Sequence, residues 1–142
     1  MAVYEFVIFD SHCHLQDRRF KRDQEEVIRN AGKCCVEKIL VPGWDLRSSK
    51  EAAAISEKFD NVFAACGVHP HDAKFYSNFV ENEIIKLSKN KKVVSIGEIG
   101  LDYYRNLSPR SVQKDVFKRQ LVIAEENNIP VIIHTRDSIK DT

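Results

Sequence analysis

The chain has 142 residues, of which 43% are hydrophobic and 30% are charged, and it contains no long apolar run and no repetitive segment. This balance is typical of one globular domain and excludes fibrous, low-complexity and membrane-spanning proteins, so we expect no membrane partner. The chain has 22 basic and 21 acidic residues, so its net charge is +1. A charge this small gives no long-range attraction for a polyanion.

The cysteines and the first residues indicate the cellular compartment. The four cysteines form no C-x-x-C pair and no regular disulfide framework. The segment from Met1 to Phe9 carries Glu5 and lacks a basic start, so it does not resemble a secretory signal. We therefore expect free thiols and a cytoplasmic location, with the nucleus as the alternative.

Five short apolar runs, rich in branched or aromatic residues, predict strands. They are continuous and do not alternate with polar residues, which is typical of strands covered on both faces in a parallel sheet. The runs are Phe6–Phe9, Val36–Val41, Val62–Cys66, Val93–Ile96 and Ile129–Ile133.

Helical patterns lie between these runs. Gly32 is the expected stop of the first helix, and Ser48, three residues before Glu51, predicts a capping box at the start of the second. The four helices are expected at about residues 24–31, from 48 to 59, 80–87 and 112–126. Strands and helices thus alternate, which is the rhythm of a (β/α)8 barrel or a doubly wound sheet with right-handed crossovers.

Potential metal ligands cluster at the carboxyl ends of the predicted strands. In a parallel barrel these ends converge on one face, where the active sites of that fold lie. The residues are Asp10, His12 and His14 after the first strand, His69 and His71 after the third, Glu98 at the end of the fourth and His134 at the end of the fifth.

His12 and His14 are two residues apart in an extended segment, so both imidazoles can reach one ion. Glu98 and His134 add a carboxylate and a third imidazole, a mixture that suits zinc, manganese or related divalent ions. The alternatives are that the two histidines are structural and that Glu98 forms a salt bridge with Arg136.

Other polar residues near these strand ends have two interpretations each. His69 and His71 could contact substrate, or their loop could only cap the next helix through Asp72. Arg136 could clamp a phosphate through paired N–H donors, or pair with Asp102 or Asp137.

Two basic clusters, residues 18–22 and 89–92, could likewise face phosphate, although a solvated surface is the simpler interpretation of both.

Four blocks in this order resemble the TatD family of metal-dependent deoxyribonucleases. The blocks are Phe9-Asp10-Ser11-His12-Cys13-His14-Leu15, Gly67-Val68-His69-Pro70-His71, Ile96-Gly97-Glu98-Ile99-Gly100-Leu101-Asp102-Tyr103-Tyr104, and Pro130-Val131-Ile132-Ile133-His134-Thr135-Arg136-Asp137. The resemblance implies a TIM-type (β/α)8 barrel, of which residues 1–142 would be the incomplete N-terminal part, with about the first five strands and four helices.

The same resemblance implies a centre of one or two divalent ions, Mg, Mn or Zn. His12 and His14 would bind one ion, His134 the second, and Glu98, the expected catalytic residue, would bridge them. His69, His71, Asp102 and Arg136 are the expected substrate contacts. The implied activity is hydrolysis of DNA phosphodiester bonds, often from the 3′ end, with DNA as substrate.

The family pattern continues with a further histidine and an aspartate, which this sequence does not contain up to Thr142. We therefore expect a fragment, a truncated product, or a chain whose barrel a partner completes. Two alternatives remain open at this point. One is a metal-dependent ester or amide hydrolase, such as a D-aminoacyl-tRNA deacylase, and the other is a catalytically incomplete chain that only binds metal or a partner.

Overall fold

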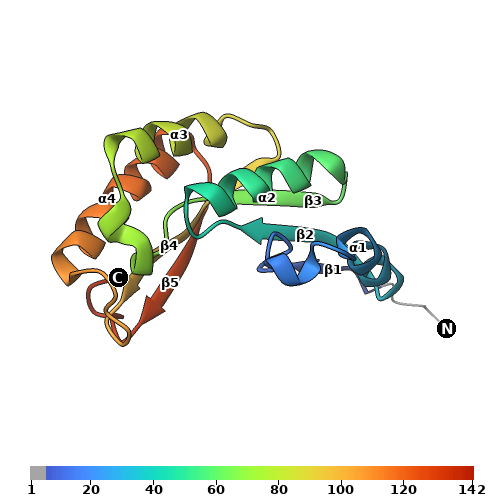
Figure 1. Ribbon diagram of the computed structural model, residues 1–142, viewed down its shortest axis with the longest axis horizontal. Helices are drawn as coiled ribbons and strands as arrows, with labels where there is room; N and C mark the ends of the chain where they lie inside the picture. The colour runs from blue at the N-terminus through green and yellow to red at the C-terminus, as the bar shows by residue number, and fades with distance from the viewer. Residues whose placement is uncertain (1–5) are drawn as a thin grey trace.

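The computed structural model describes residues 6–142, which form a curved sheet of five parallel strands with helices on its outer side (Figure 1). The strands follow one another in chain order across the sheet. The elements are β1 (Ile8–Asp10), η1 (Arg18–Phe20), α1 (Gln24–Lys33), β2 (Val36–Pro42), α2 (Leu46–Lys58), β3 (Val62–Cys66), η2 (Pro70–Phe75), α3 (Asn78–Ser88), β4 (Val93–Asp102), α4 (Arg110–Glu126) and β5 (Val131–Arg136).

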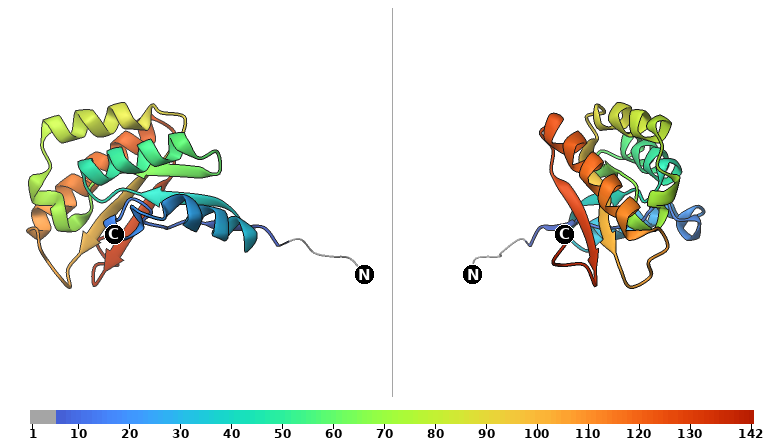
Figure 2. Two further views of the ribbon diagram at one scale, coloured as in Figure 1. Left: turned by 45° about the vertical axis from the view of Figure 1, so that its right-hand side comes forward. Right: turned by 90° about the vertical axis from the view of Figure 1, so that its left-hand side faces the viewer.

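The sheet curls as the first half of a (β/α)8 barrel does, which confirms the predicted fold class. Figure 2 shows α2, α3 and α4 on the convex face, while the described residues place no helix over the concave face. The core lies between the strands and these helices, because apolar side chains from both fill that layer. Its fully buried members include Val41, Val62, Ala64, Ile84, Ile96 and Ile99.

The start of α2 differs from the prediction. The helix begins at Leu46, so Ser48 is its third residue and Asp45 is the N-cap. The Ser48 amide donates to Asp45 Oδ1 at 2.6 Å, and the Asp45 amide donates to Ser48 Oγ at 2.9 Å. The capping box is therefore Asp45 with Ser48, because aspartate caps an N-terminus as well as serine does.

The end of α1 and the start of α3 also differ from the prediction. Gly32 lies inside α1, and the chain turns at Cys35, whose φ is 65°. The N-cap of α3 is Ser77, whose side chain accepts a hydrogen bond from the Val80 amide. Asp72 lies in η2, so it does not cap α3.

The fourth strand is longer than predicted and reaches the rim of the sheet. β4 continues through Gly97 and Gly100 to Asp102. Its residue pairing with β5 shifts between Ile96 and Ile99. Gly100 has φ of 143°, and a Cβ there would collide with the carbonyl oxygen of His134. A glycine at this position therefore permits the close approach of β4 and β5.

The outer strands of the sheet carry exposed apolar side chains. Ile8 and Phe9 on β1 are 47% and 52% exposed, and Ile133 on β5 is 46% exposed. These strands lie at the two edges of the described sheet, as expected for an incomplete barrel. Between residues 6 and 142, every helix is too short or too polar to cross a membrane.

Candidate metal centre

The predicted strand-end residues come together on one rim of the sheet. All five histidines of the chain lie there and form a connected cluster with two carboxylates. The cluster comprises His12, His14, His69, His71, Glu98, Asp102 and His134. Of the residues predicted at the strand ends, Asp10 is outside the cluster, because its Oδ1 accepts from the main-chain amide of His12 at 3.1 Å. The other six converge as expected for parallel strands.

The first group in this cluster combines His12, His14 and Glu98. The Nε2 atoms of the two imidazoles are 3.3 Å apart, and His12 Nε2 lies 3.3 Å from Glu98 Oε2. The other nitrogen of His14 lies 3.2 Å from the carbonyl oxygen of Pro42, so its Nε2 faces His12. Two imidazoles and one carboxylate with ligand atoms within 4.8 Å of one another fit a divalent ion.

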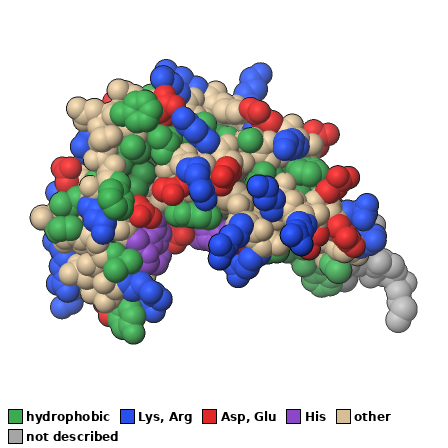
Figure 3. All heavy atoms as spheres, in the orientation of Figure 1, with side chains coloured by type: hydrophobic (Ala, Val, Ile, Leu, Met, Phe, Trp, Pro, Cys, Tyr) green, Lys and Arg blue, Asp and Glu red, His purple; other side chains and the backbone are tan. Residues whose placement is uncertain are grey.

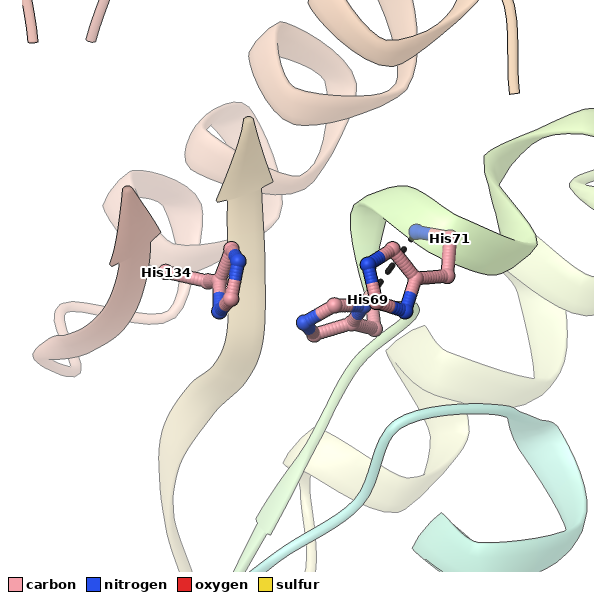
Figure 4. A group of neighbouring side chains, drawn as sticks. All are labelled: His69, His71 and His134. Carbon is pink, nitrogen blue, oxygen red and sulfur yellow. Dashed lines mark hydrogen bonds between the residues drawn. The ribbon is translucent and has the colours of Figure 1, made fainter. Parts of the chain in front are cut away.

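The second group consists of His69, His71 and His134, whose ligand nitrogens also lie within 4.8 Å of one another. Figure 4 shows His134 on its strand facing His69 and His71, which come from the loop and turn after β3. The main-chain amide of His71 donates to His69 Nδ1 at 3.2 Å, and this bond fixes the ring of His69. Three imidazoles also suit zinc or manganese.

Glu98 lies between the two groups. Its Oε2 faces His12, while its Oε1 lies 2.9 Å from His134 Nδ1 and 3.9 Å from His69 Nε2. Burial raises the pKa of the Glu98 carboxyl, but the hydrogen bond with His134 and the nearby imidazoles outweigh it and hold the pKa below its usual value. The carboxylate is therefore ionised and has one oxygen available to each group.

The pKa values of three imidazoles are shifted, and not all in the same direction. Burial, with His134 nearby, lowers the pKa of His69 to about 4, and burial next to His12 lowers that of His14. Both rings are thus held in the neutral form that binds metal. His134 is the exception, because its hydrogen bond with Glu98 raises its pKa.

Asp102 is fully buried behind the second group. Its Oδ2 lies 2.7 Å from His71 Nε2 and 3.2 Å from His134 Nε2, and its Oδ1 accepts from the Arg105 amide at 2.7 Å. Burial opposes ionisation, but these bonds together lower the pKa of Asp102 to about 2. This geometry suits a carboxylate that orients two histidines, and direct contact with substrate stays a prediction.

Arg136 contacts Tyr104, and not the carboxylates that the sequence analysis offered as partners. Its guanidinium stacks over the ring of Tyr104, with 4.3 Å to the centroid, and it is exposed. Within residues 6–142 it forms no ion pair with Glu98, Asp102 or Asp137. Since the guanidinium is not held by a carboxylate, its N–H groups are free to contact an anion at the rim.

Trp44, which the sequence analysis did not single out, lines the rim next to the first group. Its ring packs edge-on against that of His14, with centroids 5.2 Å apart. Its carbonyl accepts from the His69 amide at 2.8 Å, so the loop after β2 supports the loop after β3. A hollow of about 230 Å³ here is lined by His14, Trp44, His69, His71, Asp72 and Glu98.

Two buried glutamines of α4 were also missed. The Gln120 side chain bonds both backbone groups of Val68, accepting from its amide at 2.7 Å and donating to its carbonyl at 3.0 Å. Gln113 does the same for Asp102, at 2.8 and 3.2 Å. The available signal was polar residues seven apart on the apolar stripe of a predicted helix, where a buried amide needs a partner.

Comparisons with known proteins show to which family the chain belongs. A family profile described as TatD related DNase matches residues 9–142. An uncharacterized metal-dependent hydrolase, YabD of Bacillus subtilis, is 42% identical over 135 residues, which are 95% of this chain and 53% of YabD. The 3′-5′ ssDNA/RNA exonuclease TatD of Escherichia coli is 36% identical over 131 residues, covering 92% of this chain and 50% of that protein.

A solved structure has the same fold over nearly the whole chain. The crystal structure of YjjV, a TatD homologue from Escherichia coli, superposes with a TM-score of 0.87 and 29% identity, covering 96% of this chain and 52% of YjjV. The chain thus spans about half the length of the curated relatives it matches. Since the family profile matches residues 9–142, the chain belongs to the TatD-related DNase family.

Proposed function

We propose that this chain forms the metal-binding part of a divalent-metal-dependent hydrolase that cleaves phosphodiester bonds of single-stranded DNA from one end. One observation carries the proposal. The two oxygens of Glu98 face two separate groups of imidazoles, at 3.3 Å from His12 and 2.9 Å from His134. A carboxylate shared in this way suits a two-metal centre for phosphoryl transfer.

The side chains divide the work at such a centre. Bound divalent ions would polarise a phosphoryl oxygen, activate water near neutral pH and stabilise the leaving oxygen. His12, His14 and Glu98 would hold one ion, with His134 and Glu98 for the second. Asp102 keeps the rings of His71 and His134 oriented, and the exposed guanidinium of Arg136 is positioned to bind a phosphate.

The names of the relatives support the reaction class more strongly than the substrate. The Escherichia coli protein is called a 3′-5′ ssDNA/RNA exonuclease, whereas YabD is called only a metal-dependent hydrolase. Polarity of cleavage and preference for DNA are therefore part of the proposal. RNA and aminoacyl esters are the substrates to compare with DNA.

The test has two measurements on the same protein. Calorimetric titration with Mn²⁺ measures metal binding, and release of nucleotides from 3′-labelled or 5′-labelled single-stranded DNA measures activity and polarity. We expect His12→Ala and Glu98→Ala to weaken metal binding and abolish nucleotide release. The exposed Glu126→Gln is the control that leaves both unchanged.

Three results would contradict parts of the proposal. Activity unchanged in both His12→Ala and Glu98→Ala would refute the assigned centre. Faster turnover of D-aminoacyl-tRNA than of DNA would replace the nuclease with an esterase. Metal binding by the chain with no turnover of any of these substrates would leave a binding protein.

A further inference from the structure

A groove of about 600 Å³ separates the turn after β1 from α2, and it runs along that helix from Arg47 near its start to Lys58 at its end. Its apolar lining residues are Leu15 and Ile55, which are buried beneath the surface, and Ala54, which is exposed. The remaining lining residues are polar or charged. They are Gln16, Asp17, Arg18, Lys21, Gln24, Arg47, Glu51 and Lys58.

The charges that line the groove are mainly positive. Asp17, one of its two carboxylates, forms a paired contact with Arg19 at 3.0 and 3.2 Å. Within residues 6–142, Arg18, Lys21 and Lys58 have no carboxylate at ion-pair distance, and all three are exposed. A groove with unpaired cations on both walls attracts a polyanion even though the whole chain is close to neutral.

The structure separates the basic cluster at residues 18–22 into parts with different surroundings. Arg19 is held by Asp17, whereas Arg22 lies with Arg29 in another hollow, which three carboxylates also line. Only Arg18 and Lys21 of this cluster line the groove. The interpretation of the cluster as solvated surface therefore suits Arg19 and Arg22, but not the two residues that face α2.

Gln16 lies between the groove and the candidate metal centre. The side-chain amide of Gln16, a lining residue, donates to the carbonyl oxygen of Pro42 at 2.7 Å, and His14 Nδ1 lies 3.2 Å from the same oxygen. Figure 3 shows Lys and Arg side chains gathered on this face beside histidine atoms. A chain of phosphates could thus pass from the groove to the imidazoles without leaving the surface.

We infer that this groove binds the sugar-phosphate backbone of the single-stranded nucleic acid whose terminal phosphodiester reaches the metal centre. The inference rests on the proposed function and adds to it the surface along which the nucleic-acid strand binds. Cations along a groove neutralise successive phosphates, which is the sequence-independent part of nucleic-acid binding. Arg18, Lys21 and Lys58 bind phosphates away from the reacting bond, so they contribute to affinity and not to the chemical step.

The test compares two double variants that remove the same charge. Arg18→Gln with Lys21→Gln changes the groove, while Arg22→Gln with Arg29→Gln changes the neighbouring hollow. Fluorescence anisotropy measures binding of a labelled oligothymidylate of about 16 nucleotides. EDTA prevents turnover, and the NaCl concentration is varied. Circular dichroism checks that both variants are folded.

We expect the groove variant to bind roughly tenfold more weakly at low salt and the control variant to bind like the unsubstituted protein. The slope of log affinity against log salt should become shallower by about 1.4 in the groove variant, because two phosphate contacts are lost. Equal weakening in both variants, or an unchanged slope in the groove variant, would overturn the inference.

A second substrate separates this inference from the proposed function. Bis(4-nitrophenyl) phosphate is too short to reach the groove, so its metal-dependent hydrolysis should be the same in the groove variant and the unsubstituted protein. Oligonucleotide binding that depends on the groove, with no hydrolysis of DNA, would support the binding groove and refute the proposed nuclease function. Hydrolysis of long DNA that is unaffected in the groove variant would support the nuclease function and refute the binding groove.

Discussion

The two imidazole groups that meet at Glu98 are held to different degrees. His12 and His14 follow a three-residue edge strand, and the side chain of His12 is 39% exposed. His69, His71 and His134 lie over the buried carboxylate of Asp102 and beside loops that α4 clasps through Gln113 and Gln120. The second group is thus fixed by the protein itself, whereas the first depends more on an ion to fix its geometry.

The largest effect on the second group is expected from removing the hydrogen bonds that Gln120 makes with Val68. Gln120→Met keeps the length of the side chain but leaves the buried amide and carbonyl of Val68 without partners. We expect a loss of about 4 kcal/mol in the free energy of unfolding, measured by urea denaturation. The exposed Lys118→Met on the same helix is the control. A loss no larger than that of the control would mean that α4 does not hold this loop.

The pH dependence of stability tests the burial of the second group. In EDTA, the unfolded chain protonates His69 near its ordinary pKa of 6.5, but the folded chain does so only at about 4. Stability should therefore fall by about 3 kcal/mol as the pH drops from about 6.5 to 4. His134 has a raised pKa and contributes with the opposite sign, since its stabilisation is lost as the pH rises.

His69→Asn isolates the contribution of His69. Asparagine can still accept the bond from the His71 amide, so the loop keeps its shape. The difference in unfolding free energy between the two proteins should shrink as the pH falls toward 4. A constant difference between pH 7 and pH 4 would show that His69 is not held neutral by the fold.

The shared carboxylate connects the two groups, and Glu98→Gln removes its charge at nearly constant shape. We expect Mn²⁺ affinity to fall at least about 100-fold, because both groups lose their anionic ligand. Isothermal calorimetry measures the change, with Glu126→Gln as the control. Retention of one full-affinity site would show that Glu98 serves a single group and does not bridge.

The smallest expected effect sharpens the comparison most directly. In EDTA, His12→Asn should change the free energy of unfolding by less than about 0.5 kcal/mol, since the ring is partly exposed. His134→Asn should cost about 2 kcal/mol, because Glu98 and Asp102 each lose a contact. Thermal unfolding of the two variants measures both values. Equal losses would mean that the two groups are held alike.

The sequence predicted the parts of this structure that depend on local pattern. Continuous apolar runs gave the strands, and helical spacing gave α1 to α4, because each pattern reflects burial of one element against its neighbours. Capping was harder. Asp45, Ser48 and Glu51 are all capable of a role at a helix start, and the choice depends on where the preceding strand releases the chain.

The rim residues were predicted because polar side chains at strand ends are conspicuous, and the family resemblance already implied that Glu98 lies between His12 and His134. The contacts that hold these side chains in place were not predicted. The position of Glu98 between two groups depends on the pairing shift between β4 and β5, which arises from contacts distant in sequence. Trp44, Gln113 and Gln120 escaped notice for a related reason. Each resembles an ordinary loop or surface residue until the backbone groups that it contacts are known.

The spacing of the two α4 glutamines along the helix sets the distance between the two segments that they bind. Positions 113 and 120 are two turns apart, so their amides leave the same face about 10 Å from each other along the axis. This interval fixes how far the turn that carries His69 stands from the strand end that carries Asp102. A single residue inserted between the two glutamines would rotate one of them by about 100° and uncouple one loop from the other. Insertions or deletions in α4 should therefore be tolerated near its ends and should disrupt the site between Gln113 and Gln120.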